Sequence, residues 1–176
     1  MYLGLDLGTS CLKGLVVDGA QKIVAEATAP LSVSRPQAGW SEQSPADWIT
    51  AAEAVLLALQ PEVRRAIDGI GLSGQMHGAT LLDASDNVLR PCILWNDTRA
   101  HAEAARLDAN PRFRALTGNI VFPGFTAPKL AWVKTHEPEI FRQVAKVLLP
   151  KDYLRLWLTG EHAAEMSDAA GTSWLD

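Results

Sequence analysis

Hydrophobic and polar residues alternate strictly at the start of the chain. Over residues 2–7, Leu3, Leu5 and Leu7 share one face while Asp6 lies on the other, the pattern of a half-buried strand. Two more β-type runs follow at residues 11–17 and 22–27. A Gly-Thr-Ser turn separates the first pair, and Asp-Gly, a hairpin signal, separates the second pair. The chain is therefore predicted to open with three strands in meander order.

The spacing becomes helical after a polar loop over residues 30–44. Ser44 is a suitable N-cap residue, Pro45 suits the first helical position, and Asp47 completes a capping box. We predict a helix here that ends near Pro61. Its apolar stripe consists of Trp48, Ala52, Val55, Leu56 and Leu59.

Short apolar runs alternate with helical segments in the rest of the chain. Strands are predicted at residues 67–73, 79–83, 92–95 and 144–149. Helices are predicted from Thr98 to Leu107, from Ala127 with Thr126 as cap, from Pro138, and over residues 151–158. This order predicts an α/β domain with a mixed sheet and flanking helices.

Composition narrows the functional classes. The chain has 176 residues, the size of one domain, and 48% of them are hydrophobic, enough for a real core. The net charge is −4 and Lys and Arg form no stripe, which argues against a nucleic-acid partner. Cys11 and Cys92 stand alone in apolar runs and are expected to be reduced. The sequence shows neither a signal peptide pattern nor a membrane-spanning run, so a cytoplasmic protein without a membrane partner is expected.

The first segment with candidate chemistry is the turn after the first strand, where Gly8, Thr9 and Ser10 follow Asp6 and precede Lys13. Glycine lets the backbone approach a phosphate, and the hydroxyls can donate hydrogen bonds to it. A carboxylate beside phosphate needs a cation between them, so Asp6 would hold Mg²⁺ or a metal-bound water. An ordinary hairpin with Asp capping the turn explains the same residues, and the motif alone leaves both readings open.

A second candidate follows the strand predicted at 67–73. Gln75, Met76 and His77 precede a glycine, as residues at ligand-facing loop ends often do. A neutral His can both donate to and accept from a ligand hydroxyl, and Met offers an adaptable apolar wall. The competing interpretation, a half-buried His bonded to a backbone carbonyl, is the one that these residues favour when taken alone.

The third candidate is the segment that joins Trp95, Asp97 and Arg99. A tryptophan beside polar partners resembles a sugar-binding arrangement, an apolar plate with groups for the hydroxyls. The alternative is a strand end followed by a helix cap, which we favour for Thr98. The run Gly69–Gly74 also matches G-x-G-x-x-G, but its glycines occupy a strand and no helix follows, so a dinucleotide site is rejected.

The opening hairpin resembles the first phosphate motif of the sugar kinase, Hsp70 and actin superfamily. More narrowly, the chain resembles the carbohydrate kinase family that includes glycerol kinase, gluconokinase and xylulokinase, and the Gln-Met-His-Gly run is most similar to bacterial xylulokinases. The further segments that carry this resemblance run in order along the chain: Trp40-Ser41-Glu42-Gln43, Gly74-Gln75-Met76-His77-Gly78, Trp95-Asn96-Asp97-Thr98-Arg99, Gly124-Phe125-Thr126-Ala127-Pro128-Lys129-Leu130, Leu149-Pro150-Lys151-Asp152-Tyr153-Leu154 and Ser167-Asp168-Ala169-Ala170-Gly171-Thr172.

The resemblance implies a ribonuclease-H-like domain, with residues 1–176 as most of the N-terminal lobe of a two-lobe enzyme. It implies ATP-dependent phosphorylation of a sugar, D-xylulose at its terminal hydroxyl, with ATP and Mg²⁺ as cofactors. Asp6 would act on Mg²⁺ and phosphate. Phosphate would lie against Gly8, Thr9, Ser10 and Lys13; the sugar would contact Gln75, Met76, His77, Trp95, Asp97 and Arg99.

In the family, the Asp that accepts the hydroxyl proton and the adenine pocket lie beyond residue 176, so this segment alone is expected to be inactive. Gly124 stands where glycerol kinases have an aromatic residue beside the substrate, which leaves room for a longer sugar. A homodimer stays open, as do a kinase for another pentulose or gluconate, a non-catalytic sugar-binding relative, and an actin- or chaperone-like ATPase.

Overall fold

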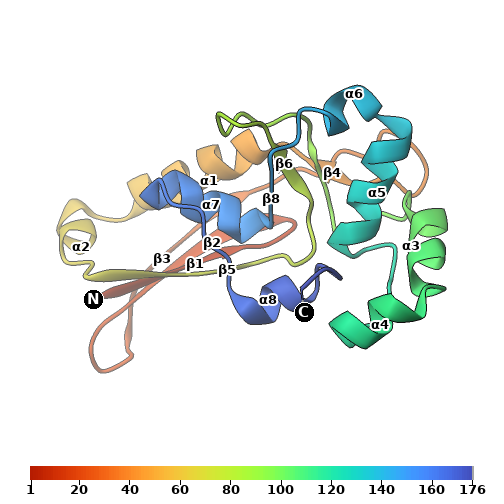
Figure 1. The fold of residues 1–176 in the computed structure, drawn as a ribbon. Coiled ribbons are helices and arrows are strands. Elements are labelled where there is room, and N and C mark those ends of the chain that lie inside the picture. Colours follow the sequence, from red (N-terminus) through yellow and green to blue (C-terminus); the bar gives the residue numbers. More distant parts are fainter. Residues whose placement is uncertain (176) are drawn as a thin grey trace.

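The computed structural model describes residues 1–175, and Figure 1 shows their arrangement. A four-stranded sheet has the order β3-β2-β1-β5. Its strands are β1 (Tyr2–Leu7), β2 (Cys11–Val17), β3 (Ile23–Pro30) and β5 (Gly69–Gly74). The β1–β2 and β2–β3 pairs are antiparallel, and the β1–β5 pair is parallel. The predicted meander and mixed sheet are confirmed.

The alternation in β1 places its leucines in the main core. Leu3, Leu5 and Leu7 are at most 1% exposed, and burying each contributes about 1.5–3 kcal/mol. Helices α1 (Pro45–Ala58) and α7 (Pro150–Thr159) cover this face of the sheet (Figure 1). Trp48 and Leu154, both fully buried, are the side chains by which these helices enter the core.

A second group of helices lies at the far end of the sheet. It contains α3 (His101–Asp108), α4 (Pro111–Thr117), α5 (Thr126–His136) and α6 (Pro138–Phe141). Two small antiparallel sheets link it to the main sheet. They pair β4 (Glu42–Gln43) with β7 (Cys92–Ile93), and β6 (Thr80–Leu82) with β8 (Lys146–Leu148). The remaining elements are α2 (Pro61–Arg65) and α8 (Met166–Ala170).

Several predicted boundaries are wrong. Thr98 does not cap α3, because its hydroxyl donates to the carbonyl of Gly39 and the helix begins at His101. Ser44 occupies the N-cap position of α1, but its side chain makes no capping bond, so the predicted capping box does not form. Phe125, not Thr126, precedes α5. The predicted polar loop over residues 30–44 contains β4, and the short helices α4 and α8 were not predicted.

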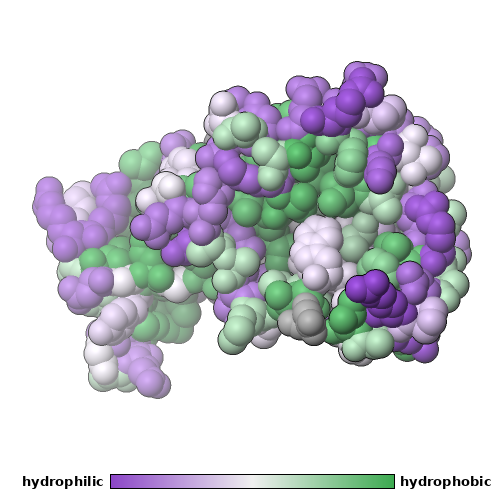
Figure 2. All heavy atoms as spheres, viewed as in Figure 1, coloured by the Kyte–Doolittle hydropathy of each residue, from purple (hydrophilic) through white to green (hydrophobic). Residues whose placement is uncertain are grey.

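Hydrophobic residues are not evenly spread over the surface. Figure 2 shows hydrophobic residues gathered in the middle of one face, between hydrophilic residues over α2 and over α6. Exposed apolar side chains include Phe122 and Trp174, which are 54% and 44% exposed. Both cysteines are free. Within residues 1–175, no helix has the length and hydrophobicity needed to cross a membrane.

Candidate functional site

The carboxyl ends of β1 and β5 bring the first two candidate segments together. The strands are parallel and in register, with Leu7 opposite Gly74, so the chain leaves both at the same edge of the sheet. The N–H of Gln75 donates to the carbonyl of Leu7 at 2.8 Å. The turn containing Thr9 and the loop containing His77 therefore begin side by side, although they are far apart in the sequence.

A chain of hydrogen bonds joins three of the predicted site residues. The hydroxyl of Thr9 donates to Oε1 of Gln75 at 3.2 Å, and the indole N–H of Trp95 donates to the Thr9 hydroxyl at 3.0 Å. Gln75 is 6% exposed while Trp95 is 43% exposed. The indole of Trp95 thus forms a partly open wall beside the phosphate-type turn.

Gln43 anchors this group, although no role was predicted for it from the sequence. Its Oε1 accepts from Gln75 Nε2 at 2.8 Å and from Trp48 Nε1 at 3.0 Å. Its Nε2 donates to the carbonyls of Thr9 at 2.7 Å and Ser32 at 3.2 Å. Since Gln43 is 2% exposed, it fixes both the turn and the loop from beneath. Its neighbours Ser41, Glu42 and Ser44 are also polar, so no local signal in the sequence set Gln43 apart.

The turn itself offers donors to an anion. The N–H of Gly8 closes the hairpin by donating to the carbonyl of Cys11 at 3.0 Å, so it is not directed at a ligand as the sequence suggested. Within residues 1–175, the N–H groups of Thr9 and Ser10 donate to no other group. These two N–H groups and the exposed Ser10 side chain are the donors that remain for phosphate.

Asp6 and Lys13 lie on the outer face of the sheet. They are cross-strand partners, and both line a shallow hollow together with Ser73. The hydroxyl of Ser73 donates to Oδ1 of Asp6 at 2.6 Å. Lys13 forms an ion pair with Glu26 at 3.5 Å and is half exposed. The Asp6 carboxylate is therefore accessible near the turn, while the Lys13 amine is paired with a residue of β3.

The His77 loop has an unusual backbone. His77 has φ 62°, the left-handed region that residues other than glycine seldom adopt. Its ring packs on Phe125 with centroids 4.6 Å apart. A Cβ on Gly171 would lie 2.3 Å from the ring atom Cε1, so only glycine fits behind it. Met76 is 44% exposed and lies at the surface of the loop.

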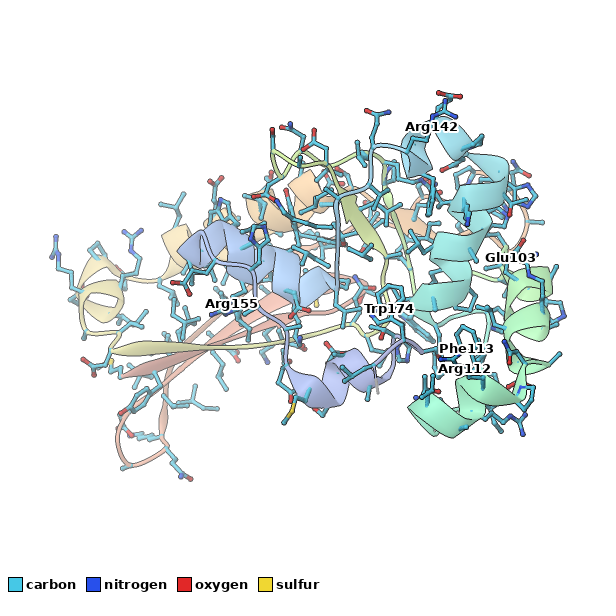
Figure 3. The ribbon with its side chains drawn as sticks, viewed as in Figure 1. Glu103, Arg112, Phe113, Arg142, Arg155 and Trp174 are labelled. Carbon is cyan, nitrogen blue, oxygen red and sulfur yellow. The ribbon has the colours of Figure 1, made fainter. Side chains whose placement is uncertain are left out.

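Two loops close around the start of α5. Thr126, Thr172 and Trp174 line a small hollow there, and Figure 3 shows Trp174 in the middle of the molecule beside the first turn of α5. The N–H of Ala127 donates to the carbonyl of Thr172 at 2.9 Å. This contact attaches the segment after α8 to the same region that holds His77.

Asp97 and Arg99 are turned into a buried ion-pair network rather than toward Trp95. The side chains of both residues are 1% exposed, and Arg99 Nη2 lies 2.7 Å from Asp97 Oδ2. Arg99 also contacts Glu42 at 2.7 Å and stacks over Trp40, its Cζ being 3.6 Å from the ring centroid. Arg90 approaches the same Glu42 oxygen at 2.5 Å. The network joins β4, the segment after β7, and α5 through Trp132.

Lys129 is a buried residue that the sequence analysis did not single out. Its side chain is fully buried on α5, and Nζ donates to the carbonyls of His77 at 2.8 Å and Gly124 at 2.6 Å. Burial lowers the pKa of Lys129 to about 7. Its position three and four residues before the buried Trp132 and Val133 was the signal, because such residues share one helix face.

Burial also sets the protonation of the neighbouring groups. It lowers the pKa of His77, and the nearby Lys129 lowers it further, so the imidazole is neutral at pH 7 and can both donate and accept. Burial raises the pKa of Cys92 to about 11. That thiol is therefore not a nucleophile at neutral pH.

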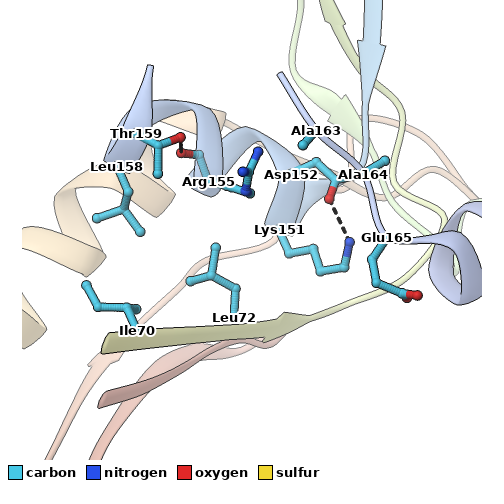
Figure 4. Close-up of a pocket in the computed structure, with 10 residues that line it drawn as sticks. All are labelled: Ile70, Leu72, Lys151, Asp152, Arg155, Leu158, Thr159, Ala163, Ala164 and Glu165. Carbon is cyan, nitrogen blue, oxygen red and sulfur yellow. Dashed lines mark hydrogen bonds and ion pairs between the residues drawn. The ribbon is translucent and has the colours of Figure 1, made fainter. Parts of the chain in front are cut away.

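A cavity of about 620 Å³ lies away from these residues, between β5 and α7 (Figure 4). Ile70 and Leu72 line one side, facing Leu158, and Lys151 forms an ion pair with Asp152 at 2.6 Å. Lys151 also contacts Asp168 at 2.9 Å, which ties α8 to α7. The cavity follows the unpaired edge of β5, and charged side chains such as Arg155 and Glu165 line it beside the apolar ones.

Comparison with known proteins places the chain in a family. The model of the N-terminal domain of the FGGY family of carbohydrate kinases matches residues 1–176. The xylulose kinase of Escherichia coli K12 is 56% identical over 178 residues, and that of Bacillus subtilis is 45% identical over 178 residues. These alignments cover 100% and 98% of this chain, but only 37% and 36% of the relatives' length.

Solved structures agree with the sequence relatives. A structure described as a xyloylose kinase from Brucella ovis has a TM-score of 0.97 and 67% identity, covering 99% of this chain and 37% of its own. The xylulose kinase from Rhodospirillum rubrum has a TM-score of 0.93 and 36% identity, covering 99% of this chain and 38% of its own. These neighbours confirm the expected ribonuclease-H-like fold with its mixed sheet and flanking helices. The chain belongs to the FGGY family of carbohydrate kinases, and it corresponds to their N-terminal domain.

Proposed function

We propose that this chain is most of the N-terminal lobe of a two-lobe kinase that transfers the γ-phosphoryl group of ATP to the terminal hydroxyl of D-xylulose. One observation carries the proposal: Thr9 and Gln75 are hydrogen-bonded at 3.2 Å. This bond places a phosphate-type turn beside a loop suited to sugar hydroxyls, as transfer between the two ligands requires. The names of the relatives, xylulose kinases in both cases, support the choice of sugar.

The proposed binding residues divide into one group for phosphate and one for the sugar. Thr9 and Ser10 would bind phosphate oxygens through their N–H groups and the Ser10 hydroxyl, with Gly8 holding the turn closed. His77 would bind a sugar hydroxyl with its neutral imidazole, while Met76 and Trp95 would contact the carbons. For Asp97 and Arg99 we propose a positioning role, because each already has buried partners. Lys13 would act only through long-range charge.

The Asp6 carboxylate suits a magnesium ion bound mainly by the nucleotide. Mg²⁺ at kinase sites is typically held by one or two carboxylates, substrate phosphates and water. Asp6 is exposed, and Ser73 donates to only one of its oxygens, so the second oxygen can face a hydrated cation. Within residues 1–175, no three His, Cys, Asp or Glu side chains form a ligand set, which fits this mode rather than a protein cage. When bound, Mg²⁺ would neutralise phosphate charge.

The proposal is tested on the intact protein by coupled ADP release with D-xylulose, other pentuloses, gluconate and glycerol. We expect ADP release that depends on D-xylulose, and a product whose mass has increased by one phosphoryl group. ATP hydrolysis independent of sugar would identify an ATPase instead. Sugar binding without turnover would identify a non-catalytic relative. Residues 1–176 alone should release no ADP, since we place the proton-accepting Asp and the adenine site elsewhere in the intact protein.

The same proposal implies where the protein acts and which molecules it meets. Because ATP is the proposed phosphoryl donor, we expect the protein to act in the cytoplasm. Its expected partners are small molecules, namely ATP and the sugar. The mass of the intact protein in solution shows whether it forms the homodimer that the resemblance leaves open.

A further inference from the structure

Lys129 presents an unusual case of a buried amine without an acidic partner. Its side chain is fully buried, and among the described residues no carboxylate lies within ion-pair distance of Nζ. Burying an amine away from water is unfavourable unless its hydrogen bonds are replaced. Its two acceptors are backbone carbonyls, those of His77 at 2.8 Å and Gly124 at 2.6 Å. The contacts of the amine are therefore with the backbone of the two segments that carry these carbonyls.

The first carbonyl belongs to the strained loop. His77 has φ 62°, and its carbonyl accepts a second bond, from the hydroxyl of Thr126 at 3.1 Å. The N–H of Gly78 donates to the carbonyl of Met76 at 2.8 Å, so the loop turns tightly at this point. Two donors from α5 on one carbonyl fix the orientation of the His77–Gly78 peptide. The direction of the imidazole follows from that orientation.

The second carbonyl links the loop to the segment carrying the indole wall. A Cβ on Gly124 would lie 2.3 Å from the carbonyl oxygen of Trp95, so these two backbones touch. By binding the carbonyl of Gly124, Lys129 holds this contact against α5. One amine thus connects the loop of His77, the segment of Trp95 and the turn before α5.

We propose that Lys129 is a positioning residue for the sugar: together with Thr126 it fixes the His77 backbone, so that the imidazole stands between Phe125 and Gly171 in its binding orientation. The proposal deepens the function proposed above and rests on it. Lys129 itself is fully buried and does not touch the substrate. A purely structural role would be limited to saturating two carbonyls near the start of α5, with no effect on the imidazole.

The kinetic test uses four variants of the intact protein. Lys129→Met keeps the length of the side chain without donors, and Thr126→Val removes the second donor to His77. Lys134→Met, on the exposed side of α5, controls for loss of charge. Val133→Ala, at a fully buried position of the same helix, controls for loss of stability. All are assayed well below their melting temperatures.

We expect Lys129→Met to raise the KM for sugar at least about tenfold, since small displacements of a binding group have large effects. The KM for ATP should stay within about twofold, and Thr126→Val should show the same pattern more weakly. Both controls should keep the sugar KM of the original protein. An equal rise in sugar KM for Val133→Ala and Lys129→Met would overturn the proposal, because general loss of stability would then explain it. If Lys129→Met does not fold, Thr126→Val carries the same comparison.

A second measurement does not depend on sugar phosphorylation. In the intact protein labelled with ¹³C at Cε1 of histidine, this chain contributes the resonances of His77, His101, His136 and His162, and loss of one signal in His77→Gln identifies that of His77. At pH 8 the His77 signal reports its stacking on Phe125. Lys129→Met and Thr126→Val should move this signal and leave that of His162 in place. An unmoved His77 signal in both variants refutes the positioning role. If the original protein shows no sugar-dependent ADP release, the proposed function fails while this measurement still decides the role of Lys129.

Discussion

Replacing Asp97 with asparagine separates a structural role of the buried ion-pair network from direct sugar contact. Asp97 accepts bonds from the N–H of Ser41 at 2.6 Å and from the N–H of Arg99 at 2.9 Å. The guanidinium of Arg99 adds three contacts of 2.7–3.1 Å. Asparagine keeps the size and one oxygen, but it removes the charge and turns one acceptor into a donor facing other donors.

The size of the effect follows from what Arg99 retains. Breaking a buried ion pair by neutralising one partner costs about 3–5 kcal/mol, because the other charge stays buried. Arg99 still contacts Glu42 at 2.7 Å and stacks on Trp40, so we expect the lower end, about 3 kcal/mol. For a domain of this size that corresponds to a melting temperature lower by about 6–12 °C. The sugar KM should change less than about threefold, since no sugar contact is lost.

The assay measures thermal unfolding and steady-state kinetics on the same preparation of the intact protein. Asp47→Asn, the same substitution at an exposed position of α1, is the matched control and should leave both quantities unchanged. If Asp97→Asn melts like the original protein but raises the sugar KM tenfold or more, the buried-network explanation is refuted and direct sugar contact is supported.

Three further predictions concern the intact protein. Asp6→Asn should lower kcat by about 10²-fold or more with little change in sugar KM or melting temperature; normal turnover would exclude the magnesium role. Gly171→Ala places a Cβ 2.3 Å from the His77 ring and should raise the sugar KM, whereas Gly19→Ala, with open space around its Cβ, should not. The pKa of Lys129 is about 7 when folded and near 10.4 when unfolded, so the unfolded chain binds a proton that the folded chain lacks. The stability of the original protein relative to Lys129→Met should therefore rise between pH 7 and 9, by about 2 kcal/mol, in denaturant titrations; a flat difference would contradict the low pKa. The charged or titratable groups that act on the Lys129 amine, besides its burial, are Cys92, Asp97 and Arg99.

The sequence predicted best where local pattern alone determines structure. Strict alternation located β1 at its observed bounds, and the turn at Gly8 followed from it. The helix predicted from Thr98 exists as α3, but its predicted start is wrong, because the Thr98 hydroxyl binds the carbonyl of Gly39, a contact distant in sequence, and the helix begins at His101. Strand β4 was missed for a related reason: Glu42 and Gln43 become a strand only by pairing with β7.

The site residues show the same difference between what local sequence predicts and what distant contacts determine. Thr9, Gln75 and Trp95 were candidates from their own segments, and the structure joins them by hydrogen bonds. Gln43 and Lys129 were overlooked because polar side chains are expected at the surface. Only the tertiary fold shows that their partners lie in other segments, such as the carbonyl of His77 for Lys129.

The parallel pairing of β1 with β5 determines when the site can form during synthesis on the ribosome. Asp6 and Ser73 meet across 67 residues, so β1 leaves the exit tunnel long before its parallel neighbour exists. The meander β1–β3 can pair at once, because its contacts are local. The contact behind the His77 imidazole forms last, because Gly171, which packs against the ring, is synthesised late. A nascent chain halted before this glycine would present a formed phosphate turn beside an open His77 loop, a state in which chaperones could bind the incomplete domain.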